Sequence, residues 1–141
     1  MVSKHLSVRL DADLLQQLED QCRSSGESRS ALATRFLEEG LRMDRHPGIM
    51  FRPGPAGRRP AVVGGPDVWV LARVLRDRSG RAEETVTSLA DELALTIGQV
   101  QSAARYYEEF REEVDDWLDR LDAEADRAEA EWRRLQGLPA R

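Results

Sequence analysis

Residue types that commonly carry catalysis or bind metals are sparse in this chain of 141 residues. Its histidines are His5 and His46, and its single cysteine, Cys22, falls on the apolar side of an expected helix. One cysteine excludes a disulfide within the chain and a zinc site built from cysteines. The many carboxylates are expected on solvated helix faces, away from any pocket that would change their protonation. We therefore expect no enzyme, no catalytic residues, no metal site and no cofactor.

Polar and apolar side chains alternate between residues 5 and 10. The polar positions are His5, Ser7 and Arg9, and the apolar positions are Leu6, Val8 and Leu10. This period of two predicts a strand with one buried face and one outward face. A lone short strand is unstable because its backbone groups need a partner, and no similar strand lies nearby. Pairing with the same strand of a second copy predicts a dimer, whose two-stranded ribbon has the width of the DNA major groove.

Two helices are expected directly after this strand. Asp11 stands at the N-cap of the first helix, Gly26 ends that helix, and Ser28 caps the second. The apolar positions at helical spacing are Leu14, Leu15, Leu18 and Cys22 in the first helix and Leu32, Phe36, Leu37 and Leu41 in the second. The expected order over residues 1–45 is therefore strand, helix, turn, helix.

The motifs LSVRL at 6–10, DLL at 13–15 and GESRS at 26–30 resemble the ribbon-helix-helix family of the Arc/MetJ/CopG type, over residues 3–43. The resemblance implies that His5, Ser7 and Arg9 contact DNA bases, and Arg9 can pair with guanine through two hydrogen bonds. It also implies that Ser28, Arg29 and Ser30 contact a DNA phosphate, which suits the N–H groups at a helix start. The alternative is an ordinary amphipathic strand with two helices, in which Arg9 is only solvated.

Residues 46–110 are expected to form a small helix-turn-helix domain with a β-hairpin. Apolar runs at 49–51 and 61–63 flank a turn rich in proline and glycine, which predicts the hairpin. Asp67 and Thr96 are expected N-caps, and a further helix with an apolar face is expected over 86–93. The tight turn at 94–96 gives this helix and the next one the helix-turn-helix spacing.

The motifs HPGI at 46–49, GPAGRR at 54–59, DVW at 67–69 and ARYY at 104–107 resemble a helix-turn-helix family of bacterial antitoxins, over residues 46–118. Such proteins are typically encoded beside PIN-like ribonuclease toxins in VapBC-type modules. A DNA-binding interpretation places phosphate contacts on the hairpin wing at Arg52, Arg58 and Arg59. It places groove contacts on the last helix at Gln99, Gln101, Ser102 and Arg105. Because residues 82–110 carry a net charge of −5, the alternative is that this domain is a structural or dimerising unit.

A long helix is expected over 111–137. Apolar residues recur there at steps of four and three, which predicts a 3.5-residue seam ended by Gly137 and Pro139. The seam consists of Val114, Leu118, Leu121, Ala125, Ala128, Trp132 and Leu135. The sequence leaves three alternatives for the surface that covers this seam: the same helix of a partner subunit, the body of its own domain, or a groove on a toxin. The toxin interpretation assigns the contacts to Val114, Trp117, Leu118, Leu121, Arg127, Trp132, Arg133 and Leu135.

Charge is segregated along the chain, whose net charge is −5. Residues 1–45 carry −1, residues 46–81 carry +5, residues 82–110 carry −5 and residues 111–141 carry −4. Such asymmetry suits one chain with two partners of different sign, and carboxylates at this density suit a basic receiver such as a nuclease surface. The alternative is that these charges only solvate helix surfaces.

The sequence as a whole predicts a mainly α-helical dimer in three parts. These are a ribbon-helix-helix domain (1–45), a helix-turn-helix-like domain (46–110) and an acidic C-terminal helix (111–141). No apolar run approaches the about 18 residues of a membrane span and no apolar signal segment is present, so we expect a cytoplasmic protein.

The expected function is that of a type II antitoxin, which binds operator DNA, represses its own operon and neutralises a PIN-like toxin. One alternative is a free-standing ribbon-helix-helix regulator whose C-terminal half only oligomerises. Another is a structural coiled-coil adaptor without DNA binding.

Overall fold

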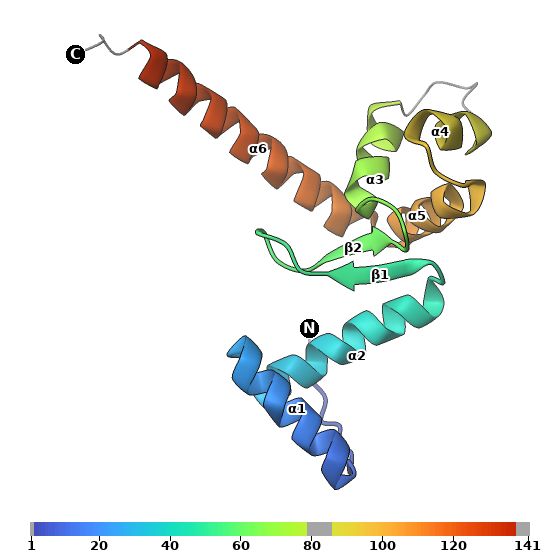
Figure 1. Cartoon of the computed structure of the whole chain (residues 1–141), viewed down its shortest axis with the longest axis vertical. Helices are drawn as coiled ribbons and strands as arrows, with labels where there is room; N and C mark the ends of the chain where they lie inside the picture. Colours follow the sequence, from blue (N-terminus) through green and yellow to red (C-terminus); the bar gives the residue numbers. More distant parts are fainter. Residues whose placement is uncertain (1, 79–85, 138–141) are drawn as a thin grey trace. The chain divides into compact units, whose positions relative to one another are not determined.

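The computed structural model describes residues 2–78 and 86–137, which are mainly helical with one small antiparallel sheet (Figure 1). The helices are α1 (Ala12–Ser25), α2 (Arg29–Arg45), α3 (Val68–Asp77), α4 (Val86–Leu93), α5 (Ile97–Glu109) and α6 (Arg111–Gln136). The strands are β1 (Ile49–Arg52) and β2 (Arg59–Val62). The chain divides into two units, Met1–Arg42 and Met43–Arg141, so that α6 belongs to the same unit as the hairpin. The prediction of a mainly α-helical chain with one hairpin is confirmed.

Local capping sets the helix boundaries of the first unit. The Asp11 carboxylate accepts a hydrogen bond at 2.8 Å from the backbone N–H three residues on, and α1 begins there. Gly26 ends α1 at φ 74°, a left-handed conformation that costs glycine little. The Ser28 hydroxyl accepts a hydrogen bond at 3.1 Å from a backbone N–H in the first turn of α2. All three predicted caps are confirmed.

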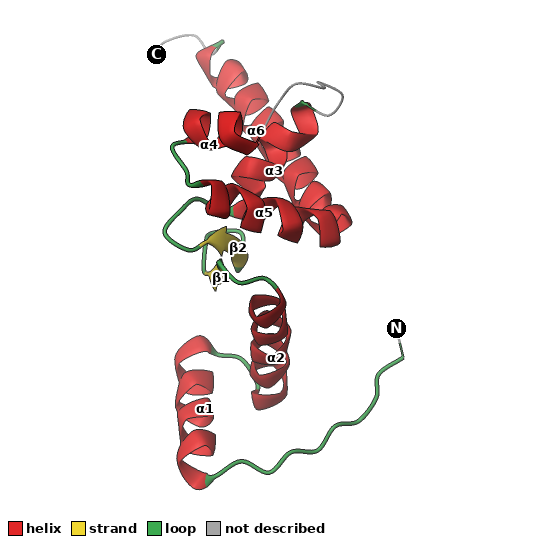
Figure 2. Cartoon of the chain, turned by 90° about the vertical axis from the view of Figure 1, so that its right-hand side faces the viewer, coloured by secondary structure: helices red, strands yellow, loops and turns green. Residues whose placement is uncertain are grey.

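Residues 2–10 belong to no helix or strand in the single chain, and they lead into α1 as an extended segment (Figure 2). Every residue of this segment is exposed. Leu6 exposes 71% and Val8 66% of its surface, although both lie on the face that the sequence predicts to be buried. The strand predicted over 5–10 therefore has no backbone partner among residues 2–78 and 86–137, and its pairing with a second copy stays a prediction.

The core of the second unit lies between the hairpin and the helices α3 to α6. Its fully buried side chains include Val62, Val68, Leu71, Val100, Tyr106 and Leu118. The helix α3 packs against β2, α5 and α6, and α4 packs against α5. Thr96 starts α5 with a complete capping box, as predicted, in which it exchanges hydrogen bonds of 3.1 and 2.9 Å with Gln99.

Asp67 connects the hairpin to the start of α3. It stands at the predicted N-cap position, but its carboxylate makes no capping hydrogen bond. Instead, it accepts hydrogen bonds from Arg52 Nε at 2.8 Å and from Trp69 Nε1 at 3.1 Å, and it forms an ion pair with Arg59. Arg52 and Arg59 face each other across the two strands, so one carboxylate holds the turn end of the hairpin against α3.

No helix among the described residues is long and apolar enough to cross a membrane.

The contacts of Asp67 predict a clear effect on stability. Asp67 is only 8% exposed, and Asp67→Asn leaves two arginines without their carboxylate. Because Arg52 and Arg59 are partly solvated, we expect a loss of about 2 kcal/mol in the free energy of unfolding, below the full cost of breaking a buried pair. Urea unfolding followed by tryptophan fluorescence measures it. Asp126→Asn, on an exposed face of α6, is the control, and equal midpoints for both variants would contradict this role of Asp67.

Candidate nucleic-acid and protein-binding surfaces

The predicted base-contacting residues lie together on the exposed N-terminal segment. His5, Ser7 and Arg9 are exposed, and none of the ion pairs formed among residues 2–78 and 86–137 involves Arg9. The apolar residues between them are exposed as well. The segment thus keeps the alternating pattern of a strand but lacks, in the single chain, the surface that would cover its apolar face.

The two helices of the first unit also have uncovered apolar faces. The helix α1 contains no buried residue, and α2 buries only Leu32 and Glu39. Between 41% and 71% of the surface is exposed at the apolar residues Leu6, Val8, Leu10, Leu14, Phe36, Leu37 and Leu41. Because a segment this short with so small a core is not expected to be stable alone, these faces require a further apolar surface.

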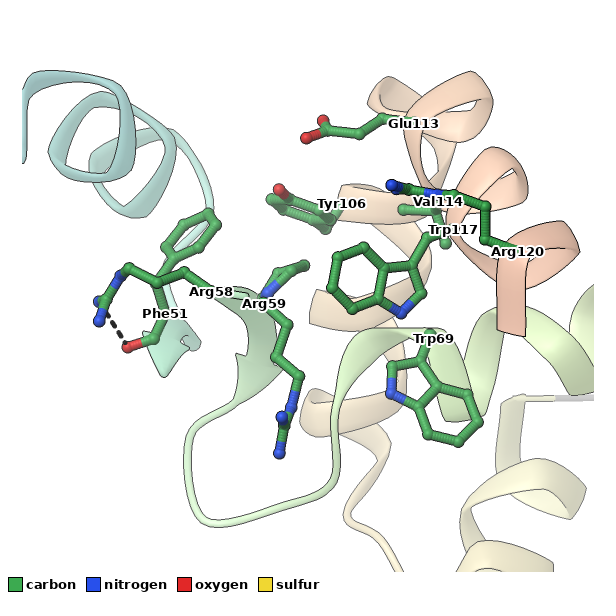
Figure 3. Close-up of a pocket in the computed structure, with 10 residues that line it drawn as sticks. Phe51, Arg58, Arg59, Trp69, Tyr106, Glu113, Val114, Trp117 and Arg120 are labelled. Carbon is green, nitrogen blue, oxygen red and sulfur yellow. Dashed lines mark hydrogen bonds between the residues drawn. The ribbon is translucent and has the colours of Figure 1, made fainter. Parts of the chain in front are cut away.

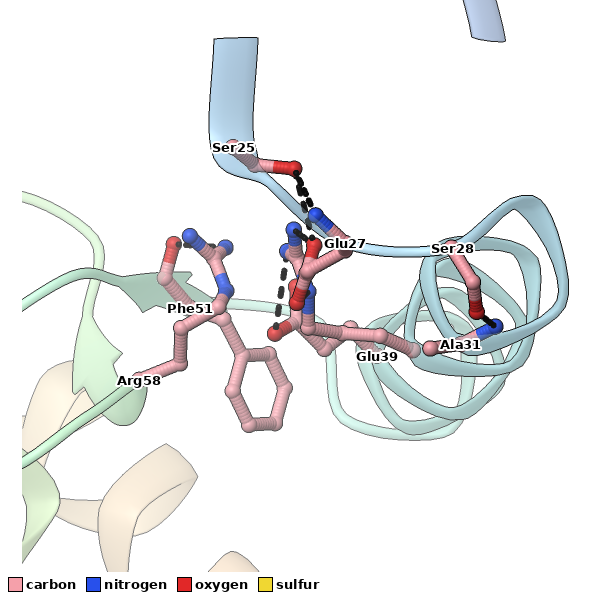
Figure 4. A network of polar contacts seen from close by, with 8 residues as sticks. Ser25, Glu27, Ser28, Ala31, Glu39, Phe51 and Arg58 are labelled. Carbon is pink, nitrogen blue, oxygen red and sulfur yellow. Dashed lines mark hydrogen bonds and ion pairs between the residues drawn. The ribbon is translucent and has the colours of Figure 1, made fainter. Parts of the chain in front are cut away.

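The start of α2 has the geometry of an anion site. Ser28 caps the helix through the N–H of Ala31 (Figure 4). Arg29 and Ser30 follow it with exposed side chains, and Arg29 forms an ion pair of 3.2 Å with Glu19. Glu27, one residue earlier, would repel a phosphate, but Arg35 binds its carboxylate through two hydrogen bonds of 3.2 and 2.8 Å. The hydrogen bond to Glu27 raises the pKa of Arg35 above its ordinary value. The carboxylate of Glu27 is therefore paired with Arg35 within the same unit. The N–H groups at the start of α2 then favour an anion.

The arginines of the hairpin wing have partners within the protein. Arg52 and Arg59 bind Asp67, as described above, and Arg58 donates a hydrogen bond of 3.2 Å to the Phe51 carbonyl. A DNA phosphate would have to compete with these contacts. The predicted phosphate role of the wing thus has an alternative in the structure, where the same arginines stabilise the hairpin.

Two of the four predicted groove residues on α5 have partners within the protein, and the other two are exposed. Gln99 donates to the Val63 carbonyl at 3.1 Å, and Ser102 donates to the Pro47 carbonyl at 3.2 Å. These two side chains hold the chain on either side of the hairpin. Gln101 and Arg105 are exposed. This arrangement is in line with the structural role that the sequence leaves open for the domain.

The seam of α6 divides into a packed part and an exposed part. Val114 is 5% exposed and Leu118 is fully buried, both in the core of their own unit, so neither side chain can reach a partner in this fold. Leu121 and Trp117 are half-buried. The remaining predicted toxin contacts, Arg127, Trp132, Arg133 and Leu135, are exposed. Of the three possible receivers, the body of the protein's own domain takes the first part of the seam.

A small cavity beside α6 was not predicted from the sequence. It has a volume of about 160 Å³, and its walls include Phe51, Trp69, Tyr106 and Trp117, with Arg58 and Arg120 among the lining residues (Figure 3). A neighbouring cavity of about 180 Å³ shares Trp117 and Arg120 and continues to Leu121. Because these side chains come from β1, α3, α5 and α6, no single periodic pattern could reveal the cavity. The aromatic residues at positions 51, 69 and 117 were the available signal, but the sequence patterns assign them to the hairpin, to the DVW motif and to the toxin contacts.

Polar contacts from α3 and α5 fix the first half of α6. Arg73 binds Asp122 at 2.7 Å, and Arg76 binds Asp119 at 2.8 Å and Asp122 at 3.2 Å. The Tyr107 hydroxyl donates a hydrogen bond of 2.7 Å to Asp115. Burial and, to a lesser degree, this hydrogen bond raise the pKa of Tyr107 to about 12.

Residues 2–78 and 86–137 contain no group of three or more His, Cys, Asp or Glu side chains that could hold a metal ion.

The raised pKa of Tyr107 predicts a pH-dependent stability. The folded protein retains this proton where an unfolded tyrosine releases it, so the contribution is complete below a pH of about 10 and declines as the pH rises toward 12. Tyr107→Phe should lower the free energy of unfolding by about 1 kcal/mol at neutral pH and make its decline above pH 10 shallower. Urea unfolding at several pH values measures both effects. Parallel pH profiles for the variant and the original protein would contradict the prediction.

Comparison with known proteins gives no family to which the chain can be assigned. No protein-family model, curated protein or solved structure matches it. The functional conclusion therefore depends on the two surfaces described here, namely the N-terminal segment with the start of α2, and the exposed part of α6.

Proposed function

We propose that this chain is a dimeric ribbon-helix-helix DNA-binding protein that works in the cytoplasm as the antitoxin of a type II module. The observation that carries the DNA-binding part is the exposed, alternating segment 5–10, followed by two capped helices whose apolar faces are uncovered. A second copy supplies both missing partners at once. Its segment 5–10 pairs with the backbone, and its helices cover the apolar residues.

In this dimer, the outward face of the ribbon enters the DNA major groove. Pairing turns Leu6, Val8 and Leu10 toward the helices, and the same alternation turns His5, Ser7 and Arg9 toward the bases. Arg9 carries the sharpest specificity, because a guanidinium can bind the two acceptor atoms of guanine together. The start of α2 binds a backbone phosphate and fixes the register of the ribbon.

The antitoxin part is supported by α6 and by the resemblance of residues 46–118 to antitoxin domains. The exposed part of the seam, with Trp132 and Leu135, lies in an acidic segment that suits the basic surface of a ribonuclease. The protein acts by binding, without catalysis of its own. The alternative, a free-standing regulator, differs only in giving α6 an oligomerising role.

Arg9→Ala should weaken binding to DNA from the promoter of the protein's own gene by about tenfold, because it removes two hydrogen bonds to a base. Arg23→Ala removes the same charge from an exposed position of α1 and serves as the matched control. Fluorescence anisotropy at one fixed salt concentration measures both affinities, since phosphate contacts depend strongly on salt. Equal affinities for the two variants would remove Arg9 from base recognition.

Ending the chain after Ala123 should abolish toxin neutralisation and leave the second unit folded. The shortened chain keeps Val114, Leu118 and Leu121, whereas ending it after residue 110 would remove buried core residues and unfold the unit. The assay is growth rescue during co-expression with a PIN-like ribonuclease encoded by the adjacent gene, and circular dichroism checks the fold. Full rescue by a folded, shortened chain would favour the free-standing regulator.

A further inference from the structure

The second half of α6 is an uncovered helix surface of the second unit. From residue 123 to Gln136 every residue is exposed, and the helix extends away from α3, α5 and the hairpin (Figure 1). This part is about 20 Å long. Trp132 and Leu135 expose 59% and 54% of their surface. An isolated helix of this length is marginally stable in water, so its stability calls for a partner along the seam.

The first half of α6 already shows what covers this seam. There α3 packs against it, and Arg73 and Arg76, one helical turn apart, bind the acidic residues Asp119 and Asp122. The cover thus consists of an apolar helix face edged by cationic side chains. In the second half the seam continues, and its edges are again acidic.

Every charged residue along the edges of the seam is acidic. In heptad terms, Leu118, Ala125 and Trp132 occupy position a, and Leu121, Ala128 and Leu135 occupy position d. The edge position g holds Glu124 and Glu131, and no ion pair among the described residues involves either of them. The edge position e holds Asp122, which binds Arg73 and Arg76, and Glu129, which binds Arg133. A partner along this seam therefore meets unpaired carboxylates on the side of Glu124 and Glu131.

This arrangement disfavours a second copy of α6 as the partner. In an antiparallel pair, Glu124 would face Glu131 of the other helix, which places two unpaired like charges opposite each other and is destabilising. In a parallel pair, Glu124 would face Glu129 of the other helix, whose carboxylate already binds Arg133 and offers no cation to Glu124.

We propose that the exposed half of α6, residues 124–136, binds a different protein through an apolar stripe that carries lysine or arginine along the edge facing Glu124 and Glu131, and does not self-associate. This inference rests on the proposed function only in giving α6 a partner, and it adds the chemistry of that partner. The cavity lined by Trp117, Leu121 and Glu124 lies at one end of this surface, and it shares Trp117 with the other cavity.

A pair of synthetic helical peptides tests the proposal on the full-length protein. Both peptides carry leucine at positions a and d, and one carries lysine and the other glutamate at positions e and g. Fluorescence anisotropy of the labelled peptides should show binding of the lysine peptide at least about tenfold tighter than that of the glutamate peptide. Equal affinities, or no binding of the lysine peptide, would overturn the proposal.

Two double variants separate edge contacts from general attraction to an acidic protein. Glu124→Gln with Glu131→Gln should weaken binding of the lysine peptide about tenfold. Asp116→Asn with Asp126→Asn removes the same charge from positions f and b and should change it less than about threefold. Trp132→Ala, which alters no charge, should also weaken binding. Equal losses in the two double variants would reduce the interaction to net charge and overturn the proposal.

Sedimentation equilibrium tests the exclusion of a second copy. Trp132→Ala with Leu135→Ala should leave the mass of the full-length protein unchanged, whereas a lower mass would show self-association through α6. The failure of this inference can be told apart from the failure of the proposed function. If the protein prefers the lysine peptide but does not neutralise a PIN-like toxin, the antitoxin function is contradicted and the inference stands. If the variant with Trp132→Ala and Leu135→Ala still neutralises the toxin, the inference is contradicted and the antitoxin function stands.

Discussion

Covering apolar side chains is the constraint on which the rest of this structure depends. In the second unit, the hairpin and α3 to α5 enclose a core, and the first half of α6 completes it with Val114 and Leu118. Where the chain offers no such enclosure, it leaves whole apolar faces in water. These faces lie on residues 5–10, on α1 and α2, and on the second half of α6. Each exceeds scattered surface hydrophobicity, because its members recur at the period of one strand or helix face.

The positions of the arginines in the second unit are explained by the same packing of elements around a core. Residues 46–81 carry a net charge of +5, and this count by itself suggests a basic surface. In the fold, Arg52 and Arg59 converge on Asp67, and Arg73 and Arg76 converge on the acidic edge of α6. Much of the positive charge therefore holds elements of the protein together. A count of charges along the sequence could not distinguish arginines that bind within the protein from arginines that face solvent, because each carboxylate partner lies at least several residues away in sequence.

Features set by local interactions were predictable, and features set by distant contacts were not. Asp11, Gly26 and Thr96 act within one turn of their own helix, so their residue types and positions were enough to predict the caps. Asp67 was equally well placed for a cap, but the hairpin brings Arg52 and Arg59 to it, and these charged donors bind its carboxylate instead. The cavity at Trp117 and the point where the seam leaves the core depend on packing between elements far apart in sequence. The predicted ribbon requires a second chain, so a single copy does not test it.

The position of the acidic charge connects the fold with the proposed partner. In the first half of α6, Asp119 and Asp122 are paired with Arg73 and Arg76, so these two carboxylates contribute less to the field outside the protein. Glu124 and Glu131 edge an apolar stripe that no described residue of the second unit covers. A nuclease binds its substrate through cations that recognise phosphate, and carboxylates compete for the same cations. An acidic, apolar helix is thus suited to occupy such a surface, whereas the segment that we propose as the DNA-binding ribbon carries Lys4 and Arg9 in the other unit of the chain. In the proposed function, this separation of charge lets one acidic protein bind DNA through its first unit and a nucleic-acid-binding enzyme through α6.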